Sequence, residues 1–345
     1  MENVLVLLHT EADGALPKAA FEAVGAASRL AASLGSGGFA IGIVGGSIAS
    51  AASAVAGAGA ARLLAAEHPA FAESRYATDA AAAAALCRAS GATMILAPMT
   101  ARWARAIPGV AHRIGGRVDT HITGLSAADG AVQATRWFYR QRMEGTITRT
   151  PRPWVLLLDP GAHPAWSGAP GTAAPEIVGV EVTGAMTRTT VVGIEAPPAE
   201  QQTIKPDADL LFVAGAGWTK KQADGQTHTQ DAEPLILDFL RAARASLGSS
   251  KSLVDLSGEG HAVLTFMSHM NQVGQTGSTP RHPKGLATCC HGEEPHVVGW
   301  RFISERRAVN LDPNCGWARG KADVLYVADA FAVMKAVNAI LAAGE

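Results

Sequence analysis

Strand-like segments alternate with helix-length segments through the first hundred residues of this chain. The strand-like segments are Val4–Leu8, Phe39–Val44, Arg62–Ala65 and Thr93–Ala97, and the helical ones are Pro17–Leu34, about Ile48–Ala58 and about Thr78–Ser90. Largely apolar strands separated by helices are typical of a parallel sheet that helices cover on both faces. The alternation therefore predicts an α/β fold.

The pattern changes after residue 115, where several strand-like segments follow one another without helices. These segments are Val118–Thr123, Ala131–Tyr139, Thr146–Arg149 and Trp154–Leu158. Links of hairpin length join antiparallel strands, whereas parallel strands need longer crossovers. We therefore expect an antiparallel extension of the parallel sheet.

The chain is long enough for two domains. Residues 160–176 are rich in Pro, Gly, Ala and Ser, and Ala196-Pro197-Pro198 follows, which is typical of an exposed connection. We place the boundary near residue 200, with domains at 1–200 and 201–345. The second domain is expected to be a doubly wound α/β unit with strands at Leu210–Ala214, Ser252–Val254, Arg307–Leu311 and Val324–Ala328, and helices at about Glu233–Ser246 and Ala330–Ala342.

Composition argues against several functional classes. Lys and Arg number 29 against 30 Asp and Glu, so no net charge draws the chain to nucleic acid. No apolar run reaches membrane-spanning length without Gly or polar breaks. The N-terminus lacks a basic segment and leads directly into Val4–Leu8, so it predicts a buried strand and not a secretory signal. A cytoplasmic location is expected.

The most specific motif is the run Asn271–Gly277. Gly274 and Gly277 enclose Gln275-Thr276, so the backbone can turn tightly and bring its N–H groups close to a flat or anionic ligand. The side chains of Gln272, Gln275 and Thr276 add hydrogen-bond donors and acceptors at the same place. The run predicts a ligand-binding loop.

Three further segments carry candidate binding groups. Gly215-Ala216-Gly217 follows a strand, and a helix after this turn would direct its N-terminus at phosphate, although two glycines after a strand also suit a purely structural turn. Ser250 and Lys251 lie in the segment Gly248–Asp255, where Lys251 is either a binding group or a solvated surface residue. Polar residues at Asn310, Asp312 and Asp323 complete the set.

Together these motifs resemble the flavin site of the electron-transfer flavoprotein α subunit. Gln272-Val273-Gly274-Gln275-Thr276-Gly277 matches the family's flavin loop, and Lys251 takes the place of an Arg that lies against the isoalloxazine ring. Gly215–Gly217 resembles a family turn that normally contains Arg. The resemblance further implies contacts to FAD from His291, Gly292 and His296, and to its adenosine half from Asn310 and Asp323. Asn310 and Asp312-Pro313 resemble the family's Asn-Lys-Asp-Pro, so Asp312 is included among the cofactor-binding candidates. His291 replaces a family Ser.

The resemblance implies an electron carrier that binds FAD, without catalytic residues of its own. Its partners would be an electron-transfer flavoprotein β-like subunit in contact with residues 1–200, a flavin dehydrogenase or Fe–S/flavin complex as donor, and a quinone reductase or other acceptor. The altered family positions suggest a specialised member, such as a fixed subunit of a larger dehydrogenase complex. Two alternatives stay open: a non-redox scaffold or regulatory subunit that retains an adenine-nucleotide pocket, and a self-sufficient flavin oxidoreductase.

Cys289-Cys290-His291, with Cys315, raises the question of a metal site. Neighbouring cysteines converge poorly on one ion, because metal-binding pairs usually have intervening residues. They are also poor disulfide partners for each other, and the four cysteines indicate a reduced compartment. We therefore expect no metal, and small buried residues beside the cofactor instead.

Overall fold

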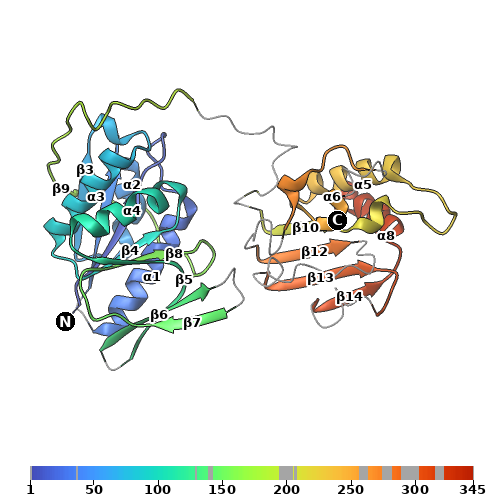
Figure 1. Ribbon diagram of the computed structural model, residues 1–345, viewed down its shortest axis with the longest axis horizontal. Helices are drawn as coiled ribbons and strands as arrows, with labels where there is room; N and C mark the ends of the chain where they lie inside the picture. Colours follow the sequence, from blue (N-terminus) through green and yellow to red (C-terminus); the bar gives the residue numbers. More distant parts are fainter. Residues whose placement is uncertain are drawn as a thin grey trace. The chain divides into compact units, whose positions relative to one another are not determined.

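The computed structural model divides into two compact units, Met1–Ile194 and Glu195–Glu345, here the N-terminal and C-terminal units. It describes residues 2–35, 38–128, 130–138, 143–193, 205, 208–255, 263–273, 282–288, 303–314 and 322–344. Each unit contains one sheet with packed helices (Figure 1). The α/β class predicted from the sequence is confirmed.

The N-terminal unit has a nine-stranded mixed sheet in the order β7-β6-β5-β8-β4-β1-β2-β3-β9. Its strands are β1 (Val4–His9), β2 (Phe39–Gly45), β3 (Arg62–Glu67), β4 (Met94–Pro98), β5 (Arg117–Ala128), β6 (Ala131–Phe138), β7 (Met143–Ile147), β8 (Trp154–Leu158) and β9 (Glu176–Ile177). Parallel pairing runs from β5 to β9, and β6 pairs antiparallel with both β5 and β7. The expected antiparallel extension is therefore present.

Helices cover both faces of the central strands. The helices are α1 (Lys18–Leu34), α2 (Ala49–Val55), α3 (Tyr76–Ser90) and α4 (Ala101–Arg113), with short 3-10 helices η1 (Ala56–Ala58) and η2 (Pro69–Phe71). Alternate residues of β1 divide between two cores, one with α1 and α2 and the other with α3 and α4. Small alanines on these helices allow close packing, which explains the alanine-rich sequence.

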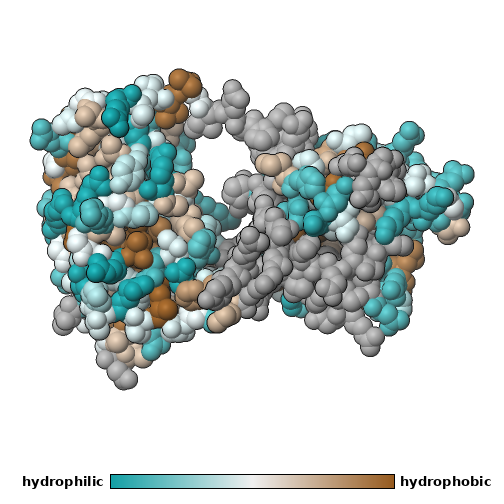
Figure 2. Space-filling model, in the orientation of Figure 1, coloured by the Kyte–Doolittle hydropathy of each residue, from teal (hydrophilic) through white to brown (hydrophobic). Residues whose placement is uncertain are grey.

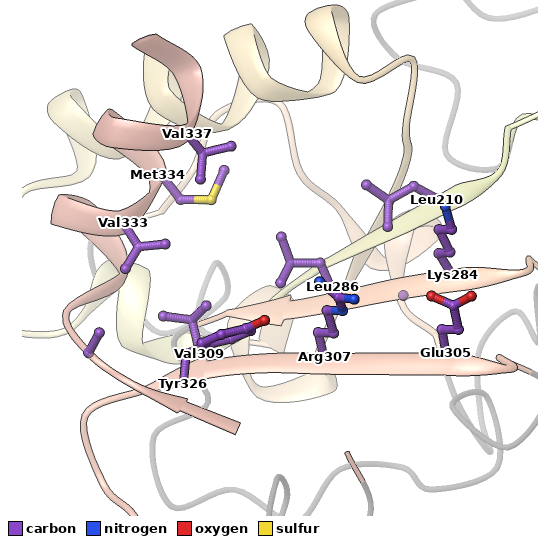
Figure 3. A pocket seen from close by; sticks show the side chains of 12 residues that line it. Leu210, Lys284, Leu286, Glu305, Arg307, Val309, Tyr326, Val333, Met334 and Val337 are labelled. Carbon is purple, nitrogen blue, oxygen red and sulfur yellow. The ribbon is translucent and has the colours of Figure 1, made fainter. Parts of the chain in front are cut away.

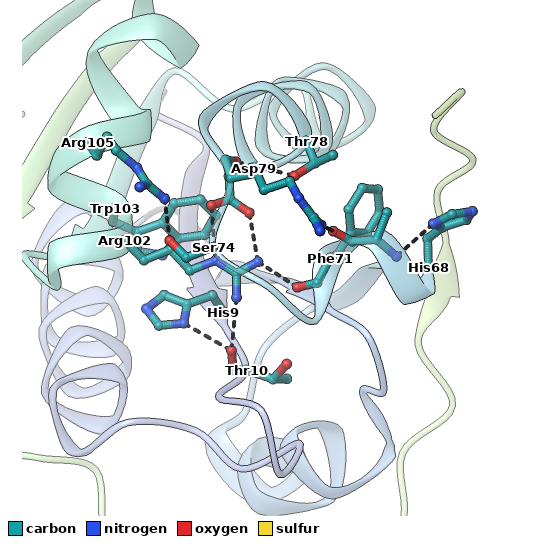
Figure 4. A network of polar contacts seen from close by, with 12 residues as sticks. His9, Thr10, His68, Phe71, Ser74, Thr78, Asp79, Arg102, Trp103 and Arg105 are labelled. Atoms are coloured by element: carbon teal, nitrogen blue, oxygen red, sulfur yellow. Dashed lines mark hydrogen bonds and ion pairs between the residues drawn. The ribbon is translucent and has the colours of Figure 1, made fainter. Parts of the chain in front are cut away.

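A buried polar network fills the carboxyl edge of the N-terminal sheet between β1 and β4 (Figure 4). The Arg102 guanidinium donates to both carboxylate oxygens of Asp79, at 2.7 and 3.1 Å, and to the carbonyl oxygens of Thr10 and Phe71. Both charged side chains are almost fully buried. The network ties α3 and α4 to the end of β1.

His9 is held in its neutral form beside this network. Its Nδ1 lies 3.2 Å from the carbonyl oxygen of Thr10, which only accepts, so Nδ1 carries the proton. Its Nε2 then accepts from the Thr100 hydroxyl at 2.8 Å, and that hydroxyl accepts from the backbone N–H of Trp103. Burial lowers the pKa of His9 to about 4.

Stability should fall with acid because unfolding releases His9 to bind a proton. The unfolded histidine is protonated below about pH 6.5, whereas the folded one stays neutral down to about pH 4. His9→Gln, which keeps an acceptor toward Thr100, should therefore remove up to about 3 kcal/mol of acid destabilisation between these two pH values. Urea unfolding followed by circular dichroism at pH 7 and pH 4.5 measures this.

His112→Gln is the matched control, because His112 is exposed on α4. It should show the same pH dependence as the unaltered chain. His163, whose pKa burial also lowers to about 4, keeps part of the acid sensitivity in every variant. An unchanged pH dependence in His9→Gln would contradict the assignment of a neutral buried His9.

The C-terminal unit has a five-stranded, fully parallel sheet in the order β11-β10-β12-β13-β14 (Figure 1). Its strands are β10 (Leu210–Ala214), β11 (Ser246–Ser249), β12 (Lys284–Thr288), β13 (Glu305–Asn310) and β14 (Val324–Val327). The helices are η4 (Ala216–Thr219), α5 (Thr229–Ala242), α6 (Lys251–Asp255), η6 (His269–Asn271) and α8 (Ala330–Ala343). Helices α5 and α8 pack together in the core on one face.

In the C-terminal unit one expected strand was wrong and one strand was not predicted. The strand expected at Ser252–Val254 is helix α6, and the strand is β11 at Ser246–Ser249 instead. The Ser250 hydroxyl accepts from the Leu253 N–H, which starts the helix one residue after the strand. Strand β12 was not expected, because Lys284–Thr288 carries little apolar pattern and forms through pairing with β10 and β13.

Hydrophilic side chains cover the loop that leads from η4 to α5 in the C-terminal unit (Figure 2). Among the described helices, none has both the length and the apolarity needed to cross a bilayer.

Candidate functional site

The carboxyl edge of the C-terminal sheet collects most of the described candidate residues. All five strands are parallel, so their carboxyl ends lie at one edge of the sheet. The chain passes from β10 outward to β11 and then returns to the other side of β10 as β12. In doubly wound sheets of this order, ligands bind at the edge where neighbouring connections run in opposite directions. Here that point lies between β10 and β12.

The turn Gly215–Gly217 closes the end of β10 against β12. The Gly215 N–H donates to the Thr288 carbonyl at 2.8 Å, and the buried Trp218 indole N–H donates to the Thr288 hydroxyl at 2.9 Å. The expectation that a phosphate-binding helix follows this turn was wrong, since η4 spans only Ala216–Thr219 and α5 begins at Thr229. The turn therefore shapes the edge by packing.

Ser250 and Lys251 follow β11 at the same edge. The Ser250 N–H donates to the Ala214 carbonyl at 2.8 Å, which continues the pairing of β11 with β10 past the strand end. Lys251 is half exposed, and its ammonium lies 3.6 Å from the Asp255 carboxylate one helical turn on. An ion pair this exposed is weak, so the Lys251 charge stays available to a ligand.

The first residues of the predicted Asn271–Gly277 loop join the sheet beside β11. Gln272 forms a parallel bridge with Ser249, and the Val273 N–H donates to the Ser249 carbonyl at 3.1 Å. Before the bridge, Asn271 and Ser268 form a capping box around η6. The loop therefore starts at the carboxyl edge, next to Ser250 and Lys251.

Two buried polar atoms at this edge lack hydrogen-bond partners among the residues the structure describes. They are the hydroxyl oxygen of Ser249, at the end of β11, and the amide nitrogen of Asn310, at the end of β13. A buried polar group without a partner costs about 1–3 kcal/mol. Their partners therefore come from a bound ligand or from the rest of the chain, and donors and acceptors of this kind suit a polar cofactor.

The acidic candidates divide between opposite edges. Asp323 precedes β14 at the amino edge, where the Arg306 guanidinium holds the pKa of its carboxyl below the usual range. It does not meet the carboxyl-edge residues. Asp329 lies at the carboxyl edge, because it follows β14 and caps α8 by accepting from the N–H groups of Phe331 and Ala332. It is close to Asn310, whose carbonyl accepts from the Ala328 N–H at 3.1 Å.

Sequence reasoning missed Asp329, although a signal was present. The dipeptide Ala-Asp occurs at Ala322-Asp323 and again at Ala328-Asp329, and only the second lies between a strand and a helix. Asp312, the remaining acidic candidate, is exposed just beyond β13 and accepts from the Asn314 N–H at 2.8 Å.

Several predicted residues lie outside the described part of the chain. They are Gly274, Gln275, Thr276, Gly277, His291, Gly292 and His296, together with the cysteines Cys289, Cys290 and Cys315. Within the described ranges, no group of three or more His, Cys, Asp or Glu side chains is arranged to hold a metal ion. The roles of the undescribed residues stay predictions.

The architecture defines a class: a two-unit α/β protein in which a mixed sheet is followed by a doubly wound parallel sheet with a polar carboxyl edge. The model of the electron transfer flavoprotein domain matches residues 4–185, more than half of the chain. The chain therefore belongs to the electron transfer flavoprotein family. A search of curated proteins finds no match.

Gly248 should be essential for the geometry of the loop entry. A Cβ atom at this position would lie 2.8 Å from Cγ1 of Val273, closer than carbon atoms pack. Gly248→Ala should therefore displace Val273 and lower the free energy of unfolding by about 1–3 kcal/mol, as measured by urea denaturation. Gly179→Ala, with no atom within 4 Å of the new carbon, is the control. Equal stability of the two variants would contradict the described packing of β11 against Val273.

Proposed function

We propose that this protein binds FAD at the carboxyl edge of its C-terminal sheet and relays electrons as an electron-transfer flavoprotein α-like subunit. The observation that carries the proposal is the meeting, at one edge, of Ser250, Lys251, the start of the Gln272–Gly277 loop and Asn310. Family membership, which rests on residues 4–185, supports a flavin-linked electron-transfer role independently of these residues.

The residues at the edge fit the chemistry of FAD. The Ser249 hydroxyl and Asn310 amide, which have no partner among the described residues, offer hydrogen bonds to hydroxyl and phosphate groups, and a carboxylate after a strand suits a ribose. We assign the ribose role to Asp329, because Asp323 lies at the opposite edge of the sheet. FAD supplies the electron-carrying chemistry, whereas the protein binds, orients and tunes it.

Lys251 has the tuning role in this proposal. It takes the family Arg position at the edge of the sheet, and its cation favours added electron density on a flavin ring placed beside it. A planar guanidinium stacks on an aromatic ring where an ammonium does not, so the Lys at this position marks a departure from the family pattern. Gly274–Gly277, Gly292, His291 and His296 are proposed to complete the ring contacts.

The protein is proposed to act with partners. The N-terminal unit would contact an electron-transfer flavoprotein β-like subunit. Its strand β7 (Met143–Ile147) is an edge strand of the described sheet, and Met143 on it is 56% exposed. Electrons would come from a flavin dehydrogenase or an Fe–S/flavin complex and leave to a quinone reductase or another acceptor. The protein is thus an electron carrier or a subunit of a larger complex.

The identity of the bound nucleotide tests the proposal. The chain, purified from its native host with its partner subunit, should be yellow and should release FAD on denaturation, measured by absorbance and chromatography. Release of AMP alone would instead support a scaffold that keeps only an adenine-nucleotide pocket. A colourless complex that releases no FAD would contradict the proposal.

An isosteric pair of variants locates the site on one edge of the sheet. Asn310→Asp replaces an amide donor that has no partner among the described residues by a carboxylate, so it should weaken FAD binding by about 5- to 150-fold, the equivalent of about 1–3 kcal/mol. Asp323→Asn, at the amino edge, should leave the affinity unchanged. Fluorescence titration of the apoprotein complex with FAD measures both. Weakening by Asp323→Asn with no effect of Asn310→Asp would place the cofactor elsewhere.

Removing the cation at position 251 should make the bound flavin harder to reduce. Lys251→Gln is expected to lower the reduction potential by tens of millivolts, since about 30 mV corresponds to 1.4 kcal/mol for a two-electron couple. Lys251→Arg should keep the potential near its original value, because the charge is retained. Spectroelectrochemical titration of the purified complex measures the potentials. Equal potentials in all three proteins would exclude Lys251 from the ring environment.

A further inference from the structure

A cavity lies on one face of the C-terminal sheet, between strands β10, β12, β13 and β14 and helix α8 (Figure 3). It has a volume of about 530 Å³ and is lined by described residues. The size falls in the range of pockets that bind small molecules, roughly 300–1,000 Å³. The cavity is formed by the face of the sheet and not by its carboxyl edge.

Most of the lining is apolar. Leu210, Leu286 and Val309 form the floor, and Val333 and Val337 of α8 form the wall above it. Leu210 and Leu286 are only partly buried although they belong to central strands of the sheet. Helix α8 therefore leaves apolar surface of the sheet accessible, and a bound apolar group would gain about 25 cal/mol for each Å² that it covers.

Charged groups gather at one end of this cavity. Lys284 and Glu305 are the first residues of β12 and β13 and lie opposite each other in the parallel register, and Arg307 follows two residues further along the same face. Among the described residues, the neighbouring Arg306 pairs with Asp323 at 2.9 Å, whereas Arg307 takes part in no ion pair. The side chains of Lys284, Glu305 and Arg307 together carry a net charge of +1 beside the apolar floor.

The side chains that line the cavity change from charged to apolar along the strands. Glu305 and Val309 are four residues apart on β13, about 13 Å in a strand. Arg307 lies between them on the same face, and the Tyr326 ring of β14 lies beside Val309 (Figure 3). A ligand that fills the cavity would therefore place an apolar portion over Leu286 and Val309 and a polar group beside the Arg307 guanidinium.

We propose that this cavity binds a small amphipathic anion, with an unbranched or flat apolar body and one carboxylate group. The Arg307 guanidinium would hold the carboxylate through paired N–H donors, a geometry that matches a carboxylate closely. The floor of β10, β12 and β13 and the wall of α8 would bury the body. The proposal does not depend on FAD, because none of the lining residues belongs to the proposed cofactor site.

Calorimetric titration of the full-length chain with sodium decanoate tests the proposal. Decanoate should bind with one site per chain, whereas butanoate, which lacks the apolar body, and decanol, which lacks the charge, should each bind at least tenfold more weakly. Arg307→Gln should weaken decanoate binding at least tenfold and leave decanol binding unchanged. Arg241→Gln is the matched control, because Arg241 is an exposed arginine of α5 outside the cavity.

Val337→Trp provides a second, independent variant, since the larger side chain should fill the cavity and abolish decanoate binding. Circular dichroism and FAD content should be unchanged in Arg307→Gln.

Three results would overturn the proposal: no saturable binding of decanoate, equal binding of decanoate and decanol, or an affinity that Arg307→Gln does not alter. Loss of decanoate binding in the complex with the partner subunit would also overturn it, and would identify the cavity as a protein-docking surface.

Discussion

Parallel pairing of β10 with β11 on one side and with β12 on the other is the constraint on which the candidate site depends. This pairing brings Gly215, Ser250 and Thr288 to the same edge, although more than 70 residues of sequence separate Gly215 from Thr288. Two backbone hydrogen bonds, from Gly215 to Thr288 and from Ser250 to Ala214, continue it beyond the strands. The edge is therefore rigid where a cofactor would need fixed contacts.

The two units use the same topological feature differently. In both, strand order reverses beside the first strand of the sheet, which is where ligands of such folds bind. In the N-terminal unit this place is filled by the buried Arg102–Asp79 pair and by neutral His9. In the C-terminal unit the corresponding edge carries Ser249 and Asn310 atoms without partners among the described residues. The two edges therefore share a topology and differ in the side chains that occupy them.

Helix α8 connects the two candidate sites of the C-terminal unit. Its N-terminus is capped by Asp329 at the carboxyl edge, and its next two turns, at Val333 and Val337, form the wall of the cavity on the sheet face. A ligand in that cavity would therefore contact the same helix that positions Asp329. Both sites depend on how α8 packs against α5 and the sheet.

The alternation of strands and helices, the antiparallel extension and the family resemblance were all readable from the sequence. They rest on local patterns, namely apolar runs, glycine and proline positions and short links, which act between residues close in the chain. The Asn271–Gly277 motif predicts a tight polar loop from its glycine and amide side chains alone, and its described start, at Gln272 and Val273, lies at the carboxyl edge.

Tertiary structure decided the rest, because partners distant in sequence outweigh weak local preference. Ser246–Ser249 and Lys284–Thr288 have little strand character of their own and become strands by pairing with β10. Parallel pairing of β14 with β13 placed Asp323 at the amino edge and Asp329 at the carboxyl edge, a distinction between two identical dipeptides that no local pattern of sequence contains.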